Sequence, residues 1–191
     1  MGKVHDEIGS ELRAFIEAQR MFFVATSALD PEGHVNVSPK GLDCFRILSP
    51  TSVAYLDYVG SGAETIAHVR QNRRITLMFC AFDGPPKILR LYGYGTIVDP
   101  DDPDFTRLRP RFPPEPAARA IVVVKIARVA DSCGFGVPIY TFERQRAQLV
   151  DWASRKGSDG LIEYQREKNA TSIDGLPAAT WLTKAPSDNE A

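Results

Sequence analysis

Runs of apolar and alternating residues predict about seven short strands along this chain, separated by Pro, Gly and Ser. Residues 75–82 form the strongest of them, and Asp83-Gly84-Pro85-Pro86 turns the chain into the next strand. A connection this short predicts antiparallel pairing. The predicted strands are residues 21–29, 34–39, 43–48, 52–58, 75–82, 88–98 and 120–129.

Apolar residues at helical spacing predict a first helix over residues 6–19. A second helix should start after Gly60 and run to about residue 71, because Ser61 and Glu64 have the spacing of a capping box. Many strands with few helices between them favour an α+β, mainly β fold. This pattern is typical of an antiparallel barrel or sandwich rather than a parallel βαβ sheet.

The character of the sequence changes after about residue 130, where residues 144–156 and 161–168 have helical patterns. We expect one domain over residues 1–183, with strands over about 20–130 and a helical extension over about 140–183. Residues 184–191 are expected to form a frayed tail.

The composition and charge of the chain exclude several classes of function. The 191 residues carry 23 Lys and Arg against 24 Asp and Glu, so nucleic-acid binding through a broad basic surface is not expected. No apolar run is long enough to span a membrane, and acidic residues stand where a signal peptide is basic and apolar. The three cysteines form no CxxC pair, which predicts a cytoplasmic protein with free thiols. His5, His34 and His68 lack the spacing of a metal site, so no metal is expected.

Two segments carry candidate ligand chemistry. Residues 36–41 (NVSPKG) end a strand with polar groups, a lysine and a glycine, and so suit a pocket wall with backbone amides and one cation; the alternative is an edge strand and a turn. The Gly60-Ser61-Gly62 turn opens a helix whose free N–H groups suit an anion. The alternative there is an ordinary capped helix, and Glu64 would repel a phosphate.

Two later segments are less decisive. Residues 132–138 (SCGFGVP) suit a loop over a ligand or a sharp corner between the strands and the C-terminal helices. Residues 168–177 (KNATSIDGLP) suit either a latch for the C-terminus or an approach to a site.

The order of elements, with the stretches VNVSPKG, YLDYVGSGAETIAHVRQN, RITLMFCAF and ILRLYGYGTIV, resembles the pyridoxamine 5′-phosphate oxidase-like family of FMN-binding split β-barrels. SCGFGVP and KNATSIDGLP look like a bacterial subgroup whose substrates are mostly unassigned. The resemblance implies an antiparallel split β-barrel with peripheral helices and a helical C-terminal extension. It also implies a homodimer that binds FMN at its interface.

The resemblance places the flavin ring along residues 35–40, and the ribityl chain and phosphate near residues 57–58 and 61–65. It also directs residues 88–91 toward the same cleft. The cofactor-binding residues it implies are Asn36, Val37, Ser38, Pro39, Lys40, Asp57, Tyr58, Ser61, Gly62, Thr65 and Arg90.

One departure from the family stands out. Glu64 and Thr65 occupy the positions where the oxidase proper holds the phosphate with an Arg-Lys pair. Lys40, Arg74, Arg90 or the helix N-terminus are the alternative sources of that charge. The departure argues against true pyridoxamine 5′-phosphate oxidase activity.

Three functions are therefore compared. The leading hypothesis is an FMN-dependent oxidoreductase acting on an unidentified small molecule, with Lys40 and backbone N–H groups stabilising negative charge on the reduced ring. The alternative is a non-catalytic module that binds or senses flavin, deazaflavin or haem, with His34 or His68 as the haem ligand. A protein–protein module without a ligand is the third, and polar residues in the 36–41 segment argue mildly against it.

Overall fold

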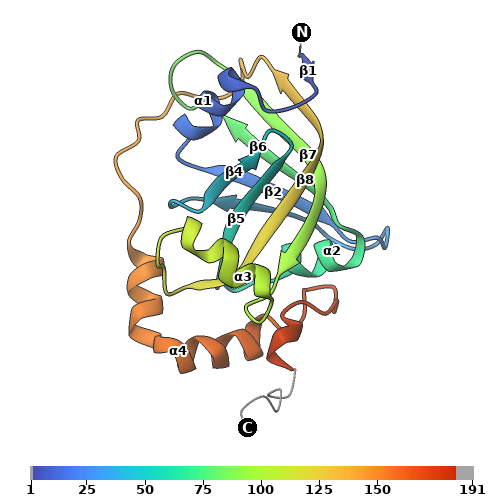
Figure 1. Ribbon diagram of the computed structural model, residues 1–191, viewed down its shortest axis with the longest axis vertical. Coiled ribbons are helices and arrows are strands. Elements are labelled where there is room, and N and C mark those ends of the chain that lie inside the picture. Colours follow the sequence, from blue (N-terminus) through green and yellow to red (C-terminus); the bar gives the residue numbers. More distant parts are fainter. Residues whose placement is uncertain (1, 184–191) are drawn as a thin grey trace.

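The computed structural model describes residues 2–183, which form an antiparallel sheet of eight strands rolled into a barrel with helices around it (Figure 1). Seven strands pair in the order β3-β2-β6-β7-β8-β5-β4, and β1 adds to β8. The strands are β1 (Val4–His5), β2 (Phe22–Ser27), β3 (Val35–Lys40), β4 (Phe45–Ser49), β5 (Ser52–Tyr58), β6 (Arg74–Cys80), β7 (Ile88–Val98) and β8 (Ala118–Ser132).

β3 and β4 are the two ends of this strand order, so the barrel is split between them. Each keeps one edge unpaired among the described strands. Because backbone N–H and C=O groups along such an edge lack ladder partners, the split is the natural place for a ligand or a second chain to bind.

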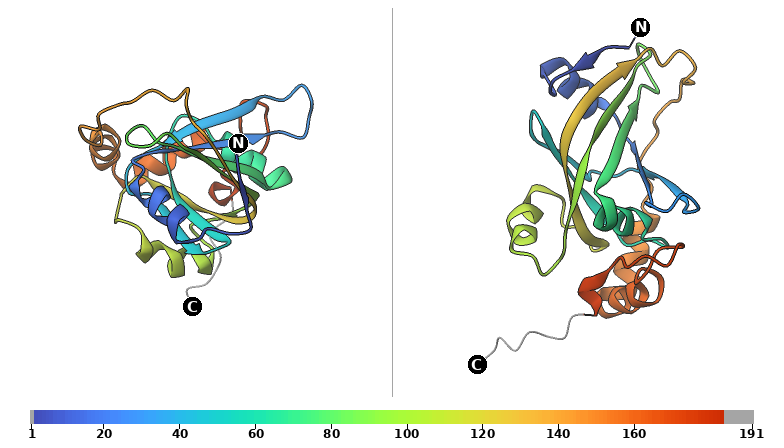
Figure 2. Two further views of the ribbon diagram at one scale, coloured as in Figure 1. Left: turned by 90° about the horizontal axis from the view of Figure 1, so that it is seen from above. Right: turned by 90° about the vertical axis from the view of Figure 1, so that its right-hand side faces the viewer.

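The helices lie at the ends and sides of the barrel. α1 (Ser10–Ala18) covers one end, near the N-terminus, and α2 (Glu64–Asn72) and α3 (Pro103–Leu108) lie toward the other (Figure 1). α4 (Gln148–Lys168) and a short 3-10 helix (Thr180–Leu182) form a layer beyond that far end, seen most clearly in the right-hand view of Figure 2. The C-terminal extension therefore closes the end of the barrel opposite α1.

An aromatic cluster fills the barrel close to the split. The Phe22 ring stacks on Phe79 with centroids 5.4 Å apart, and it meets Phe45 and Tyr55 edge to face. Phe45 also packs edge to face on Phe79 at 5.2 Å. Because β4 supplies Phe45 and β2 supplies Phe22, this cluster joins the strands on either side of the opening.

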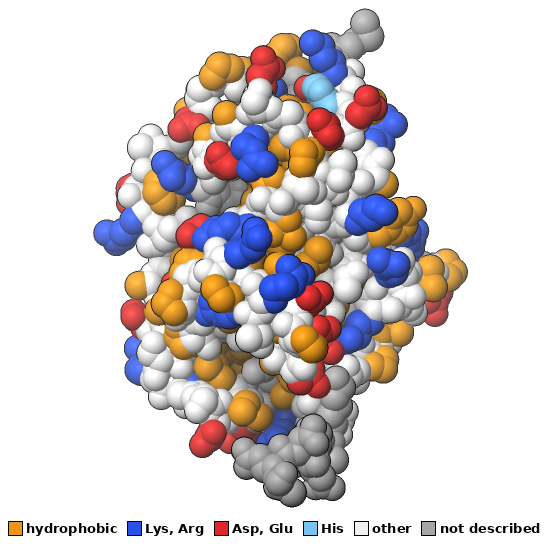
Figure 3. Space-filling view, viewed as in Figure 1, with side chains coloured by type: hydrophobic (Ala, Val, Ile, Leu, Met, Phe, Trp, Pro, Cys, Tyr) orange, Lys and Arg blue, Asp and Glu red, His pale blue; other side chains and the backbone are white. Residues whose placement is uncertain are grey.

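The fold class predicted from sequence is confirmed, and two local details differ. The predicted capping box is wrong: α2 begins after Ala63, and no side chain caps it. The first helix is shorter than predicted. The predicted pair of C-terminal helices is confirmed, because Gly157, with φ +68°, is not helical and divides α4 into two helical segments; the first of them begins at Gln148 rather than at residue 144. The predicted tail, residues 184–191, lies outside the described residues, which are the coloured part of Figure 3.

A long segment without helix or strand, residues 133–147, joins β8 to α4 and is named the arm (Figure 1). Gly134 turns the chain at φ +66°, and a Cβ there would lie 2.9 Å from the Lys87 backbone. This close approach makes SCGFGVP a sharp corner. Further along, the Tyr140 ring stacks on Phe82, and the Gln145 side chain hydrogen-bonds the Arg20 carbonyl and the Leu42 amide. The arm thereby reaches the end of the barrel that carries α1.

Candidate functional site

Strand β3 divides the predicted site residues between two faces of the sheet. Asn36, Ser38 and Lys40 are partly buried and point toward the barrel and α2, whereas Val37 and Pro39 are exposed on the outer face. This alternation follows from the two-residue period of a strand. The polar positions and the apolar positions of NVSPK therefore face different surroundings.

The inner face of β3 forms a polar cluster with α2. Asn36 Nδ2 donates to Thr65 Oγ1 at 3.0 Å and approaches Thr26 Oγ1 at 3.3 Å. Ser38 Oγ donates to Asn36 Oδ1 at 3.0 Å. These bonds tie the strand to the first turn of α2, so the Thr65 hydroxyl already has a protein partner.

Further along β3, Lys40 takes part in an ionic network around a buried carboxylate. Lys40 Nζ lies 2.8 Å from Asp57 Oδ1, and Arg119 Nε lies 2.7 Å from Asp57 Oδ2. Burial alone would raise the pKa of Asp57, but the Arg119 guanidinium and the Lys40 ammonium outweigh it and lower that pKa to about 2. Asp57 is therefore ionised near neutral pH, and it holds Lys40 at the end of the open strand.

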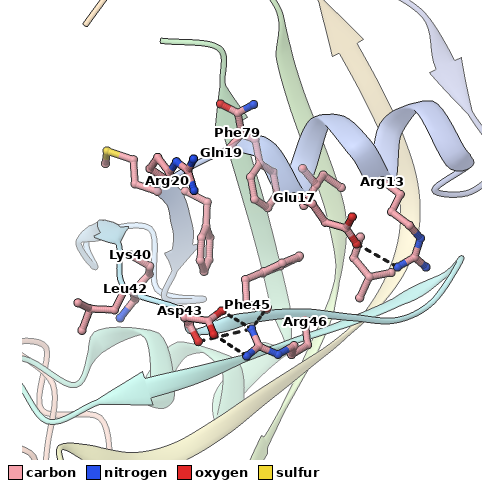
Figure 4. A pocket seen from close by; sticks show the side chains of 14 residues that line it. Arg13, Glu17, Gln19, Arg20, Lys40, Leu42, Asp43, Phe45, Arg46 and Phe79 are labelled. Atoms are coloured by element: carbon pink, nitrogen blue, oxygen red, sulfur yellow. Dashed lines mark hydrogen bonds and ion pairs between the residues drawn. The ribbon is translucent and has the colours of Figure 1, made fainter. Parts of the chain in front are cut away.

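A cavity of about 310 Å³ lies in the split beside Lys40, between α1 and β4 (Figure 4). The rings of Phe22, Phe45 and Phe79 form its apolar wall. Its charged residues include four cations and two acids, and several of them already pair with one another. The charged residues lining it are Arg13, Glu17, Arg20, Lys40, Asp43 and Arg46.

The charged residues of this cavity differ in how far they are neutralised. Arg46 makes a bidentate pair with Asp43, with nitrogen–oxygen distances of 2.5 and 2.9 Å (Figure 4). Arg13 reaches Glu17 at 3.4 Å. Arg20 instead lies over the Phe142 ring of the arm at 5.3 Å, and its guanidinium has no ion pair within the described residues. Arg20 is therefore the side chain best placed to pair with an acidic ligand here.

The start of α2 does not fit the phosphate-binding role that the sequence suggested for it. Glu64 sits there, and a Cβ on Gly62 would overlap its carboxylate, so that carboxylate folds back over the turn. Asn169 from the end of α4 donates to the Gly60 carbonyl at 2.8 Å and covers the same turn. Ser61 remains exposed. An acid and no Arg or Lys at this position makes it unfavourable for a phosphate.

Arg90 is not brought to this cluster. The register runs from Arg90 through Met78 and Phe23 to Pro39, so Arg90 and Pro39 share the outer face with two strands between them. Three strand spacings separate them by about 14 Å. Arg90 donates to Ser132 Oγ instead. Within one chain Arg90 does not join the network of Lys40 and Asp57, and its part in cofactor binding stays a prediction.

The same outer face carries a group of exposed apolar side chains, named the outer patch. Tyr92 and Tyr94 of β7 and Val35 and Val37 of β3 are its members, with Val37 60% and Tyr94 52% exposed. Tyr94 is paired with Arg74 of β6, and Tyr92 with Thr76 of β6. Strands β6 and β2 therefore lie between the two tyrosines and the two valines on the same face of the sheet. Exposed apolar groups that lie next to one another are typical of surfaces that bind a partner or a ligand.

Sequence reasoning missed Arg119, the second cation on Asp57. Its signal was present: an arginine next to the apolar run AIVVV at the start of β8. Because a charge in such a run is buried, it needs a counter-charge in the fold.

Tyr58, one of the predicted cofactor-binding residues, packs between the barrel core and the C-terminal extension, and its hydroxyl is buried without a hydrogen-bond partner.

The two histidines proposed for haem are engaged elsewhere. His68 is fully buried with Nδ1 at 3.1 Å from Thr26 Oγ1, and His34 Nδ1 lies 2.6 Å from Asp174 Oδ1. Over residues 2–183, no group of three or more His, Cys, Asp and Glu side chains is placed to hold a metal ion. Within that same range, no helix has the length and apolar character needed to cross a membrane. Neither histidine lines the cavity in the split.

The fold and this site define a class: an antiparallel split β-barrel with an open polar strand edge beside a cavity. The family model for pyridoxamine 5′-phosphate oxidase matches residues 8–133. A curated relative, the pyridoxamine 5′-phosphate oxidase family protein ustO of Aspergillus flavus, is 36% identical over 192 residues, covering 91% of this chain and 76% of that protein. The chain belongs to the pyridoxamine 5′-phosphate oxidase family.

Solved structures confirm the fold. A HupZ variant from Group A Streptococcus superposes with a TM-score of 0.51 at 19% identity, covering 65% of this chain and 99% of that one. A protein from Lactobacillus delbrueckii, provisionally assigned as a pyridoxamine 5′-phosphate oxidase, gives 0.50 at 17% identity, covering 65% and 94%. At these identities the likeness concerns the barrel architecture and not the chemistry.

Proposed function

We propose that this protein is an FMN-dependent oxidoreductase that acts as a homodimer on a small organic acid. The observation that carries the proposal is Lys40, which a buried carboxylate holds at the end of an open strand and on the wall of a cavity. Family membership supplies the class of cofactor, a flavin. FMN, once bound, would supply the redox chemistry, and the protein would supply orientation and charge.

The residues present fit a flavin ring along β3. The free edge of the strand offers backbone donors and acceptors, Gly41 follows the strand, and Lys40 brings a positive charge. A cation close to the ring would favour negative charge on its reduced form. Lys40 would therefore stabilise the reduced cofactor, and Asp57 would act as a positioning residue by fixing the Lys40 ammonium.

The homodimer is supported by the outer patch. Val37 and Tyr94 are more than half exposed on a sheet face that continues to the unpaired edge of β3. A second copy would cover both the apolar residues and the strand edge, which a monomer leaves to solvent. In this arrangement the flavin would lie between the two chains.

The substrate class follows from the cavity in the split. Its aromatic wall suits a small apolar or planar molecule, and Arg20 is a cation with no acidic partner among the described residues. A carboxylate on the substrate would pair with Arg20 while the rest of the molecule packs on Phe22 and Phe79. This cavity adjoins Lys40, so the substrate would sit beside the flavin.

Reconstitution tests the proposal. The purified protein, stripped of bound small molecules, is titrated with FMN and followed by visible absorption and flavin fluorescence. We expect saturable binding with one FMN per chain, and about a tenfold weaker affinity for Lys40→Met. The matched control is Lys156→Met, because Lys156 is an exposed lysine on α4. A protein that binds no FMN, with the wild-type sequence intact and folded, would overturn the proposal.

A substrate screen then tests the proposed substrate class, a small organic acid. Small aromatic and aliphatic carboxylic acids are offered to the FMN-loaded protein, and bleaching of the flavin band reports reduction. For any active acid, Arg20→Gln should raise KM at least tenfold with little change in kcat. Reduction by uncharged analogues alone, or an unchanged KM in Arg20→Gln, would remove Arg20 and the acid class from the proposal.

A further inference from the structure

A second cavity, of about 430 Å³, lies between the barrel and the C-terminal extension. Val59 and Ala118 line it from the barrel side, and residues of α4 and the 3-10 helix line it from the other. The extension contributes more than half of its wall, and α4 lies beyond residues 8–133, the range that the family model matches. The cavity therefore depends on the C-terminal third of the chain, which lies outside the matched range.

The charged residues that line this cavity are both positive among the residues that the structure describes. They are Arg119 and Arg166, and no Asp or Glu within residues 2–183 lines it. The cavity in the split differs in this respect, since Glu17 and Asp43 neutralise part of its charge. Two guanidinium groups without a lining acid favour an anion.

Arg119 is buried and uses only part of its hydrogen-bonding capacity. Its Nε donates to Asp57 at 2.7 Å, and its Nη1 is buried with no hydrogen-bond partner. A buried guanidinium nitrogen without an acceptor is costly, and a ligand that supplied one would remove that cost. Nη1 is therefore the donor that Arg119 has left for an oxyanion, and Arg166 supplies a second guanidinium on the same wall.

Two neutral groups complete the polar side of the cavity. Gln165 donates from Nε2 to the Leu161 carbonyl, which leaves its buried Oε1 without a partner. This oxygen is an acceptor, so it suits an O–H or N–H group of the ligand and not the oxyanion itself. Ser158 brings a hydroxyl to the same wall. The indole of Trp181 lies on the wall as well and gives an apolar surface. A few polar groups on a largely apolar wall are typical of small-molecule sites.

We propose that this cavity binds the oxyanion of a small molecule, a phosphate or carboxylate group, through Arg119 and Arg166. Because Arg119 also binds Asp57, and Asp57 binds Lys40, the oxyanion site is linked to the open strand by consecutive ionic contacts. The oxyanion is either the phosphate of the flavin itself or part of a separate ligand. In the first case the proposal rests on the proposed function, and it explains how the chain dispenses with cations at the start of α2.

Inorganic phosphate is the probe for the test. The full-length protein, dialysed free of phosphate, is titrated calorimetrically with phosphate at fixed ionic strength. We expect saturable binding to the wild type and at least a tenfold weaker affinity for Arg166→Gln. Arg155→Gln is the matched control, because Arg155 is an exposed arginine of the same helix that does not line the cavity. Arg166 is itself exposed, so Arg166→Gln should fold normally.

The outcomes separate this proposal from the proposed function. Absence of phosphate binding, or equal loss in Arg166→Gln and Arg155→Gln, overturns the oxyanion site. If Arg166→Gln also removes the preference of the protein for FMN over riboflavin, the oxyanion is the flavin's phosphate. If it weakens phosphate binding but leaves FMN affinity unchanged, or if the wild type binds phosphate and no FMN, the oxyanion belongs to a separate ligand.

Discussion

Lys40 Nζ lies 2.8 Å from Oδ1 of Asp57, a carboxylate with no exposed surface, while Lys40 itself remains partly open to solvent. The pair thus joins the inside of the barrel to the end of its open strand. Arg119 binds the second oxygen of the same carboxylate from β8. One buried acid therefore fixes two cations, each of which lines a different cavity.

This arrangement predicts a specific loss of stability in acid. The pKa of Asp57 falls from its ordinary value of 3.8 to about 2 in the folded protein. A lowered folded-state pKa contributes stability that is complete above pH 4 and is lost as the pH falls toward 2; for this shift the contribution is about 2 kcal/mol. Urea unfolding at a series of pH values measures it.

Asp57→Asn should remove that pH-dependent contribution and also cost about 3 kcal/mol at neutral pH, because Arg119 loses its buried counter-charge. The control is Asp159→Asn, an exposed acid of α4 with no such network. If Asp57→Asn and the wild type lose stability equally between pH 4 and 2, the Asp57 network is not the origin of the acid sensitivity.

Replacing Lys40 separates its charge from its shape. Lys40→Met keeps the aliphatic stem, and Lys40→Arg keeps the positive charge beside Asp57. If the charge stabilises the reduced flavin, Lys40→Met should make the reduction potential of bound FMN more negative, and Lys40→Arg should restore most of the wild-type value. Potentials measured by dye equilibration decide this. Equal potentials in the three proteins, all with FMN bound, would limit Lys40 to a structural role.

The strands were largely predictable because their apolar periodicity is strong. β7 has the predicted bounds, residues 88–98, and β5 likewise spans residues 52–58. Helix ends were less predictable, since they depend on contacts between distant segments. Ser61 does not cap α2, because Asn169 binds the carbonyl of Gly60, the residue just before it, and Glu64 accepts a bond from the Ile173 amide.

The sequence predicted the strand that carries the candidate site, but it did not predict the ionic network of Lys40, Asp57 and Arg119. Strand alternation in residues 36–40 follows from sequence, but sequence does not tell which face meets Asp57. The pairing of β5 with β8 brings Arg119 to Asp57 across 62 positions of the chain, and no local pattern encodes that contact. The role of residues 168–177, named the latch, was likewise left open; the structure shows that they join the C-terminal extension to α2 and to the β2–β3 turn.

The outer patch predicts an effect on assembly. Tyr94→Glu and Val37→Glu each place a charge in the proposed interface without disturbing the core, because both side chains are more than half exposed. Either change should weaken dimerisation at least tenfold, seen by sedimentation or gel filtration over a range of concentrations. Ile173→Glu, an equally exposed apolar residue on the C-terminal latch, should leave assembly unchanged. A wild type that is monomeric at all concentrations would contradict the homodimer.

The last prediction concerns the latch between the C-terminal extension and the β2–β3 turn. Asp174 accepts from the His34 amide at 3.0 Å and from His34 Nδ1 at 2.6 Å, and the ring bond, followed by the amide bond, lowers the pKa of this carboxyl. The lowered pKa means that the contact is complete above about pH 4 and weakens as the carboxyl protonates at lower pH. Asp174→Asn should loosen the latch at neutral pH as well, because it removes the charge from both bonds.

Amide hydrogen exchange measures how often the latch opens in each protein. The amides of Ser172 and Ala178 bond to carbonyls within the latch, so they report its opening. In Asp174→Asn they should exchange roughly fivefold faster than in the wild type, while amides of β7 stay unchanged. Asp104→Asn, on the exposed start of α3, is the matched control. Equal protection of the latch in all three proteins would show that the His34–Asp174 contact does not hold the extension against the barrel.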